Sequence, residues 1–284
     1  MRGHARAAAS RSPGITWVTV RLTIMGCSGS FPGPDSPASC YLVEAEGFRL
    51  LIDLGSGALS AVQRYAGLYE IDAVCLSHLH ADHCLDVCDY SVARTYHPGG
   101  PMPRIPVYGP AQAPVRLGRA LAADPAAQDG RPGAGPGHGI TDAFSFVTIT
   151  PGVMEIGPLR VTAAHMNHPV ETFGFRLEHA GRSLAYSADT GQTEALVDLA
   201  RDADVLFCEA SFAPPDAAAA AVLPEGLHLT ARQAAQYAAR AGVGQLVLTH
   251  LVPWNDKNAS LEEAGQAFGG PLALAAPGLG FVLD

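Results

Sequence analysis

The most constraining feature of the sequence is a short run crowded with metal-binding side chains that directly follows an apolar strand. Residues 73–83 are Ala-Val-Cys-Leu-Ser-His-Leu-His-Ala-Asp-His. Three imidazoles and one carboxylate so close together suit a borderline-soft ion such as zinc. On a turn that leaves a strand end, His78 and His80 can converge on one ion, while Asp82 and His83, just inside a helix, would face a neighbouring ion. A solvated His-rich turn is the alternative, and the crowding of these groups disfavours it.

Further candidate ligands lie where other apolar strands end. His165 and His168 follow a strand that begins near residue 161, and Asp189 and His250 each end a strand of their own. Taken singly, each is more often an ordinary core or turn residue. Together with residues 78–83 they predict a site for two metal ions, because a dinuclear site needs more ligands than one loop can supply.

Short apolar runs alternate with turn clusters from Val18 onward, which indicates a chain of strands and helices. Strands are predicted at 18–26, 39–45, 48–55, 71–78, 144–150, 159–165, 172–178, 182–189, 203–211 and 245–250, and helices at 56–65, from about Asp82, and at 231–242 behind a Thr230 cap. In each half of the chain strands come first and helices later. This order predicts an α/β (α+β) fold in which two sheets lie face to face with helices outside, a four-layer αββα sandwich. We assign residues 18–284 to one domain, residues 1–17 to a disordered extension and residues 117–140 to a flexible excursion.

Composition limits the partners and the location of the protein. The net charge is −9 and the pI about 5.6, which excludes the broad basic surface that holds long nucleic acids but permits a small anionic substrate. No apolar run approaches the roughly 20 residues that a membrane-spanning helix needs. The six cysteines form no CxxC pair, so we expect buried thiols in a reducing cytoplasm. Residues 1–17 lack the apolar segment of a secretory signal.

The motifs, taken in order, resemble the metallo-β-lactamase superfamily. His-Leu-His-Ala-Asp-His at 78–83, with Asp53 upstream and Asp189 and His250 downstream, carries this resemblance. The branch that contains tRNase Z and the cyclic-nucleotide phosphodiesterases is the most similar in pattern. Its further motifs are matched by residues 168–175, where Phe175 replaces a Tyr, and by residues 186–191, 209–212 and 228–235.

The resemblance implies a place for each ligand. It assigns His78, His80 and His168 to a first divalent ion, Asp82, His83 and His250 to a second, and Asp189 to a bridging position. Asp53 would brace the ligand loop, and His165 would be a structural histidine at a strand end. Two zinc ions are expected, although this ligand set also accepts manganese or iron.

The same resemblance implies phosphodiester hydrolysis by a hydroxide that bridges the two ions. Asp82, His228 and Glu209 form the predicted catalytic set, with His228 protonating the leaving group and Glu209 orienting it. Without the resemblance, His228 and Glu209 would be interpreted as a helix-cap histidine and a strand-end glutamate that never meet.

The expected substrate is a small anionic phosphodiester, most specifically 3′,5′-cAMP hydrolysed to the 5′-nucleotide. His168 and Asp189 are only 21 positions apart in the chain, whereas tRNase Z typically carries a long tRNA-gripping arm there. The basic loop of that family after the first strand is also absent. The alternatives are a tRNase Z-like 3′ pre-tRNA endoribonuclease and a zinc-stabilised, non-catalytic binding module. β-Lactam and thioester hydrolysis are disfavoured. Because relatives of this branch often pair, a homodimer is also among the expectations.

Overall fold

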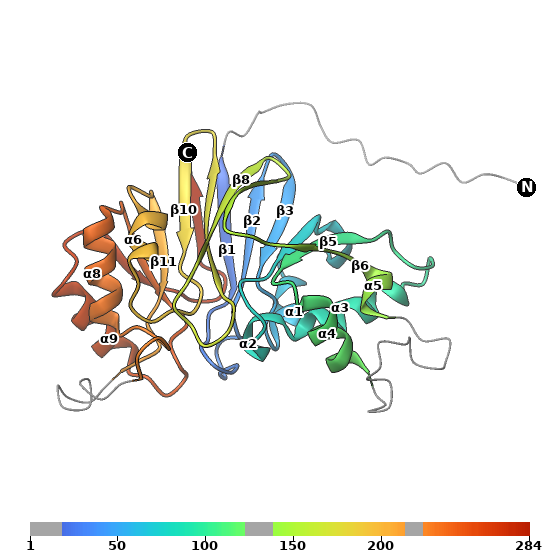
Figure 1. Ribbon diagram of the computed structural model, residues 1–284, viewed down its shortest axis with the longest axis horizontal. Coiled ribbons are helices and arrows are strands. Elements are labelled where there is room, and N and C mark those ends of the chain that lie inside the picture. The colour runs from blue at the N-terminus through green and yellow to red at the C-terminus, as the bar shows by residue number, and fades with distance from the viewer. Residues whose placement is uncertain (1–18, 123–138, 214–223) are drawn as a thin grey trace, which may run out of the picture.

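Two seven-stranded sheets lie face to face in the computed structural model, with helices on the outside of each (Figure 1). The structure describes residues 19–122, 139–213 and 224–284. Helices α6, α8 and α9 cover one outer face, and α1 to α5 lie on the other side (Figure 1). The predicted four-layer sandwich is therefore confirmed. The extension expected at 1–17 lies outside the described residues, as does most of the excursion expected at 117–140.

The elements have the following bounds. The strands are β1 (Val20–Gly26), β2 (Cys40–Ala45), β3 (Phe48–Ile52), β4 (Ala73–Cys75), β5 (Ile105–Gly109), β6 (Phe144–Thr148), β7 (Gly152–Ile156), β8 (Leu159–His165), β9 (Phe173–His179), β10 (Arg182–Tyr186), β11 (Val205–Glu209), β12 (Leu246–Thr249), β13 (Leu272–Leu274) and β14 (Gly280–Leu283). The helices are α1 (Ala58–Val62), the 3₁₀ helix η1 (Leu68–Glu70), α2 (Ala81–Cys84), α3 (Asp86–Thr95), α4 (Ala113–Leu121), α5 (Ile140–Ala143), α6 (Glu194–Ala200), α8 (Ala231–Ala241) and α9 (Lys257–Gly265).

The two sheets follow the same pattern of strand directions. The first has the order β14-β1-β2-β3-β4-β5-β6, and its neighbours pair antiparallel as far as β3 and parallel from there on. The second has the order β7-β8-β9-β10-β11-β12-β13, with antiparallel pairs as far as β10 and parallel pairs beyond. The carboxyl ends of parallel strands share one edge of a sheet, so each half presents an edge at which loops can gather functional side chains.

Alternate residues of one strand face two different cores, which is why the central strands are apolar throughout. In β11, Val205 and Phe207 belong to the core between the sheets. Leu206 and Cys208 belong to the core beneath α6 and α8. Because side chains alternate across a sheet, a strand covered on both faces needs an unbroken apolar run.

Helix α8 forms as its sequence predicts. Thr230 is its N-cap, its hydroxyl accepts the Gln233 N–H, and Gln233 closes a capping box. The alanines that face the sheet are fully buried. Small side chains on this face let the helix pack closely onto the sheet.

Several expected strands are shorter than predicted, such as β4 (Ala73–Cys75, expected at 71–78), and two other segments also differ from the structure. The helix expected at 56–65 spans only Ala58–Val62, because the chain then tightens and the N–H groups of Arg64 and Tyr65 bond three residues back. The excursion expected at 117–140 begins later, since residues 117–121 complete α4. Leu117 is fully buried there and holds the end of this helix on the core. No helix among the described residues is both long and apolar enough to cross a bilayer.

Candidate metal centre

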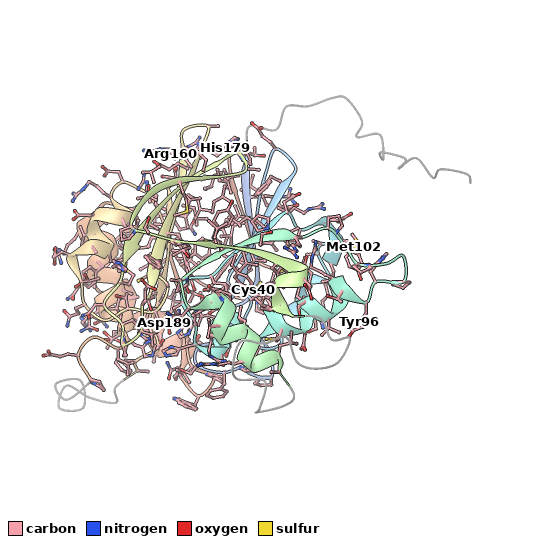
Figure 2. All side chains as sticks on the ribbon, turned by 45° about the vertical axis from the view of Figure 1, so that its right-hand side comes forward. Cys40, Tyr96, Met102, Arg160, His179 and Asp189 are labelled. Carbon is pink, nitrogen blue, oxygen red and sulfur yellow. The ribbon has the colours of Figure 1, made fainter. Side chains whose placement is uncertain are left out.

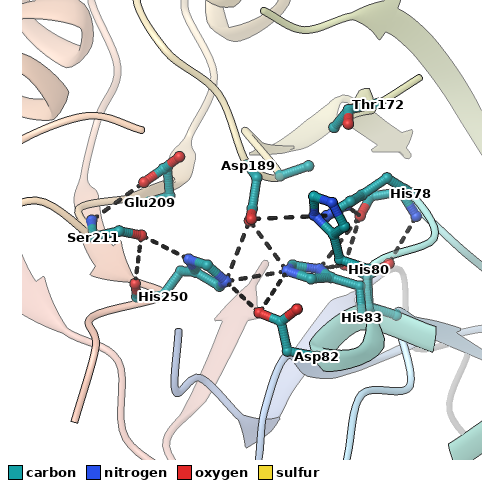
Figure 3. Close-up of polar contacts among 12 residues, drawn as sticks. His78, His80, Asp82, His83, Thr172, Asp189, Glu209, Ser211 and His250 are labelled. Atoms are coloured by element: carbon teal, nitrogen blue, oxygen red, sulfur yellow. Dashed lines mark hydrogen bonds and ion pairs between the residues drawn. The ribbon is translucent and has the colours of Figure 1, made fainter. Parts of the chain in front are cut away.

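The predicted ligands are brought together at the edge of the sandwich where the parallel strands end (Figure 3). Residues 78–83 follow β4 and enter α2, Asp189 follows β10, and His250 follows β12. His168 lies in the loop between β8 and β9. His78 and His250, more than 170 residues apart in the sequence, therefore meet at one place, as the sequence predicted.

Several of the strand ends turn through left-handed backbone. Asp53 after β3, Ala188 before Asp189, and His250 after β12 have φ values of 57°, 51° and 56°. This region is uncommon for residues other than glycine and costs on the order of 1 kcal/mol or more for each residue. These turns end the strands and direct the following chain across the edge of the sheet.

Three imidazoles form the first ligand group. His78 Nε2 lies 3.0 Å from His80 Nδ1, and His168 Nε2 lies 3.2 Å from the same atom. Ligand atoms at zinc distances in a tetrahedral arrangement are separated by about 3.3 Å. The spacing of these three nitrogens therefore fits one zinc-sized ion.

The second group combines two imidazoles with a carboxylate. His83 Nε2 and His250 Nε2 are 3.1 Å apart, and Asp82 Oδ2 lies 3.1 Å from His250 Nε2 and 3.5 Å from His83 Nε2. His83 and His250 are fully buried, whereas His80 of the first group is only half-buried. The second group is thus the more enclosed of the two.

The Asp189 carboxylate lies between the two groups. Its Oδ2 is 3.7 Å from His78 Nε2 and 3.9 Å from His168 Nε2. Its Oδ1 is 3.1 Å from His83 Nε2 and 3.3 Å from His250 Nε2, yet it is buried and makes no hydrogen bond to any described residue. A buried carboxylate oxygen without a hydrogen bond is costly unless a cation satisfies it. A metal ion held by His83 and His250 would also satisfy this oxygen.

Hydrogen bonds fix which nitrogen of each imidazole faces the centre. Nδ1 of His168 donates to the Leu227 carbonyl (2.9 Å), and Nδ1 of His83 donates to Asp53 Oδ2 (2.8 Å). Nδ1 of His250 donates to Ser211 Oγ (2.7 Å), whose hydroxyl in turn donates to the His250 carbonyl. Each bond turns Nε2 toward the centre, as in metal-binding histidines. In His83 the nearby carboxylates of Asp189 and Asp53 outweigh burial and raise the pKa, so its Nε2 must release a proton when it binds a metal.

Asp53 supports the ligands from behind rather than joining them. Its Oδ1 accepts the Ser77 N–H (2.7 Å), and its Oδ2 accepts the Ser77 hydroxyl (2.9 Å), the Tyr186 hydroxyl (2.9 Å) and His83 Nδ1. Ser77 Oγ also lies 3.0 Å from His78 Nδ1. One buried carboxylate thereby orients His83 directly and His78 through Ser77.

The electrostatics of the two groups differ. Burial lowers the pKa of His78, His80 and His168, so these imidazoles are neutral, as metal ligands must be. Burial opposes ionisation of Asp82 and Asp189, but the neighbouring imidazoles of His83 and His250 more than offset it and hold both pKa values below the ordinary range. Both carboxylates are therefore ionised.

His228 and Glu209 meet beside the ligands. His228 Nδ1 donates to Glu209 Oε1 (2.9 Å) and lies 4.0 Å from Asp189 Oδ2. Burial acts against protonation of His228, yet the hydrogen bond and charge of Glu209 raise its pKa above the usual value. Glu209 is itself held by the N–H groups of Thr190 (2.7 Å) and Ser211 (3.2 Å).

Sequence reasoning missed several supporting residues and placed one neighbour correctly. Ser77, Tyr186 and Ser211 orient the ligands, but a serine or tyrosine next to a motif carries no signal of such a role. His165 ends β8 and stacks on Phe173 with ring centroids 4.7 Å apart, outside the ligand groups found among the described residues. This position agrees with its interpretation as a structural histidine.

Residues 49–251 match the beta-lactamase superfamily domain. The chain therefore belongs to the metallo-β-lactamase superfamily, and the resemblance found in its motifs is confirmed. An uncharacterized Mycobacterium leprae protein, ML1173, is 42% identical over 267 residues, covering 92% of this chain and 88% of its own length. A Bradyrhizobium diazoefficiens protein named Ribonuclease Z is 31% identical over 291 residues, covering 87% of this chain and 94% of its own.

Solved structures share the fold. The metallo-β-lactamase fold protein YhfI from Bacillus subtilis superposes with a TM-score of 0.77 at 25% identity, covering 93% of this chain and 99% of its own. A diphosphatase from the PhnP family and unliganded yeast PDE1 give TM-scores of 0.69 and 0.67, at 21% and 12% identity. Each match covers 93% of this chain. It covers 98% of the PhnP-family diphosphatase chain and 99% of the yeast PDE1 chain. At these identities the last two matches show the fold alone. Together the relatives identify a metallo-hydrolase fold of the branch that includes ribonuclease Z.

Proposed function

We propose that the protein is a metal-dependent phosphodiesterase that hydrolyses a small phosphodiester, 3′,5′-cAMP in particular, to the 5′-nucleotide. The observation that carries this proposal is Asp189, whose two oxygens face two separate ligand groups at distances of 3.1 to 3.9 Å. A shared carboxylate between two donor sets suits a pair of divalent ions, zinc being favoured by three imidazoles in the first set.

When bound, such ions would activate a water molecule and neutralise charge that develops on the phosphoryl oxygens. The chain itself supplies the remaining functions. His228 Nδ1 is occupied by Glu209, which leaves Nε2 as the nitrogen that can give a proton to the leaving alkoxide. The hydrogen bond and charge of Glu209 raise the pKa of His228, which favours its protonated form.

The segment between His168 and Asp189 favours a small substrate. It contains only the hairpin of β9 and β10, which turns at Ala180 and Gly181. This hairpin offers no protruding arm for a tRNA, and the chain has a net charge of −9. Long nucleic acid is bound by basic surfaces that neutralise its phosphates and release their counterions, and a net charge of −9 is at odds with such a surface.

Pre-tRNA 3′ processing is the second candidate. It is favoured by the 31% identity to a protein named Ribonuclease Z across most of both chains. A zinc-stabilised binding module is the third. A closed structural zinc site has four ligands, fewer than the seven donors gathered here.

The test is chromatographic. Zinc- or manganese-loaded protein is incubated with 3′,5′-cAMP, and 5′-AMP is quantified beside the Asp82→Ala and His228→Ala variants. We expect metal-dependent 5′-AMP formation that falls about a hundredfold or more in both variants. Wild-type turnover in either variant would refute the assigned site. Two bound ions without 5′-AMP would refute the cAMP assignment, and pre-tRNA would be tested next.

A further inference from the structure

A groove of about 490 Å³ opens beside the first ligand group at His80. One wall is helix α4, and the other is the loop that contains Val170 and Glu171. The His80 ring lines the groove, while its Nδ1 belongs to the first ligand group. The volume lies within the range of small-molecule sites, so the groove can hold the part of a substrate that extends from the metal centre.

One face of α4 supplies most of the polar groups of this groove. Gln112, Val115, Arg116 and Arg119 line it at spacings of three, four and seven residues, which places them on one side of the helix. In the described part of the chain neither arginine forms an ion pair or a side-chain hydrogen bond, whereas Arg49, Arg160 and Arg182 each pair with a carboxylate. Two unpaired guanidinium groups beside the site are therefore available to a ligand.

The remaining lining is apolar and exposed. Val115 and Val170 are 48% and 37% exposed and lie on opposite walls, and Leu79 and Pro110 complete the surface. Exposed branched side chains across a groove favour a flat apolar group between them.

The balance of charge argues against a second phosphate in the groove. Glu171 opposes the two arginines and leaves a net charge of only +1. Arginine and glutamine are instead the side chains that bind the N7 edge of purines, and guanidinium planes stack on bases. Glu171 can in addition accept a hydrogen bond from an exocyclic amino group.

We propose that this groove binds the purine base of the nucleotide substrate, with Arg116 and Arg119 stacking on or bonding to the base and Gln112 bonding to its edge. This proposal rests on the proposed function, because it treats the ligand as a nucleotide whose phosphate lies at the metal centre. The valines hold the flat faces of the ring system. The base therefore lies on the α4 side of His80.

The test compares two ligands that share a ribose phosphate and differ in the base. Calorimetry measures binding of 5′-AMP and of ribose 5-phosphate to the metal-loaded protein. We expect 5′-AMP to bind at least about tenfold more tightly, as stacking of one base contributes. In Arg116→Gln and in Val115→Asp this ratio falls toward one, while the affinity for ribose 5-phosphate stays within about twofold.

The matched control is Arg160→Gln. Arg160 is exposed on β8, pairs with Glu178 and lies far from Asp189 (Figure 2). It should keep the wild-type ratio. Equal binding of the two ligands to the wild type, no binding of 5′-AMP, or an unchanged ratio in both groove variants would overturn the proposal. Since the test measures binding, failure of the groove and failure to hydrolyse cAMP are separate results.

Discussion

The two ligand groups share one carboxylate but differ in how they are built. The first consists of imidazoles made neutral by burial, includes the half-buried His80, and borders an open groove. The second is enclosed, contains the ionised Asp82, and is supported by Asp53 and Ser211. The comparison suggests a division of tasks, in which the open group meets the substrate and the enclosed group holds its ion firmly.

Removing the shared Asp189 carboxylate should have the largest effect on metal content and turnover, because both ligand groups lose this side chain. In Asp189→Ala we expect bound metal to fall from about two ions per chain to one or fewer. Turnover should fall about 10³-fold, as the loss of several kcal/mol of charge stabilisation implies. Elemental analysis of the purified protein and the 5′-AMP assay measure both.

Asp198→Ala is the control for this change. Asp198 is an exposed carboxylate of α6 whose only ion pair within the described residues is with Arg201. It should keep both ions and full turnover. An Asp189→Ala protein that still holds two ions would show that the groups do not depend on a shared ligand.

Deleting one histidine from each ligand group should show that the enclosed group contributes more to the unfolding free energy than the open group. His83→Ala leaves Asp53 and Asp189 buried without their common partner, which is expected to cost about 3 to 5 kcal/mol of unfolding free energy. His80→Ala removes a half-buried ring and should cost about 1 kcal/mol or less. Denaturant unfolding in the presence of a chelator compares the two. Equal destabilisation would remove the distinction between an enclosed and an open group.

Asp53→Asn should have the smallest effect of these substitutions. It should weaken metal binding by one ligand group more than by the other. The substitution keeps the size of the side chain but removes the charge that orients His83. Loss of such a supporting partner typically weakens metal binding about 10- to 100-fold. Titration against a competing chelator should show one ion weakened by this factor and the other weakened less. Equal weakening of both ions would mean that Asp53 supports the whole site through Ser77.

The sequence predicted the parts of the fold and site that depend on local pattern or on distinctive residue types. The strands at the centre of each sheet are apolar and bounded by turns, and histidine clusters are rare enough to stand out. Strand β5 contains Pro106 and Gly109, so its pattern does not indicate a strand, and its pairing with β4 and β6 forms it. Strand β14 at the end of the chain pairs with β1 at its start, which no local pattern can predict.

The residues that sequence reasoning could not find act through geometry alone. Tyr186 reaches Asp53 across 133 positions of the chain, and Ser211 reaches His250 across 39. Their roles follow from which loops meet at the sheet edge. The groove along α4 was missed for the same reason, since Gln112 and Arg116 look like an ordinary solvated helix face until the loop at Val170 lies opposite them.

The left-handed turns at Asp53, Ala188 and His250 have an evolutionary consequence. Selection for thermal stability alone would favour glycine at each of them, because glycine adopts this backbone without a steric penalty. At Asp53 and His250 that change would also delete a side chain on which the site depends. At these two positions the backbone disfavours a side chain while the site requires one, so relief of strain and retention of the site are opposed.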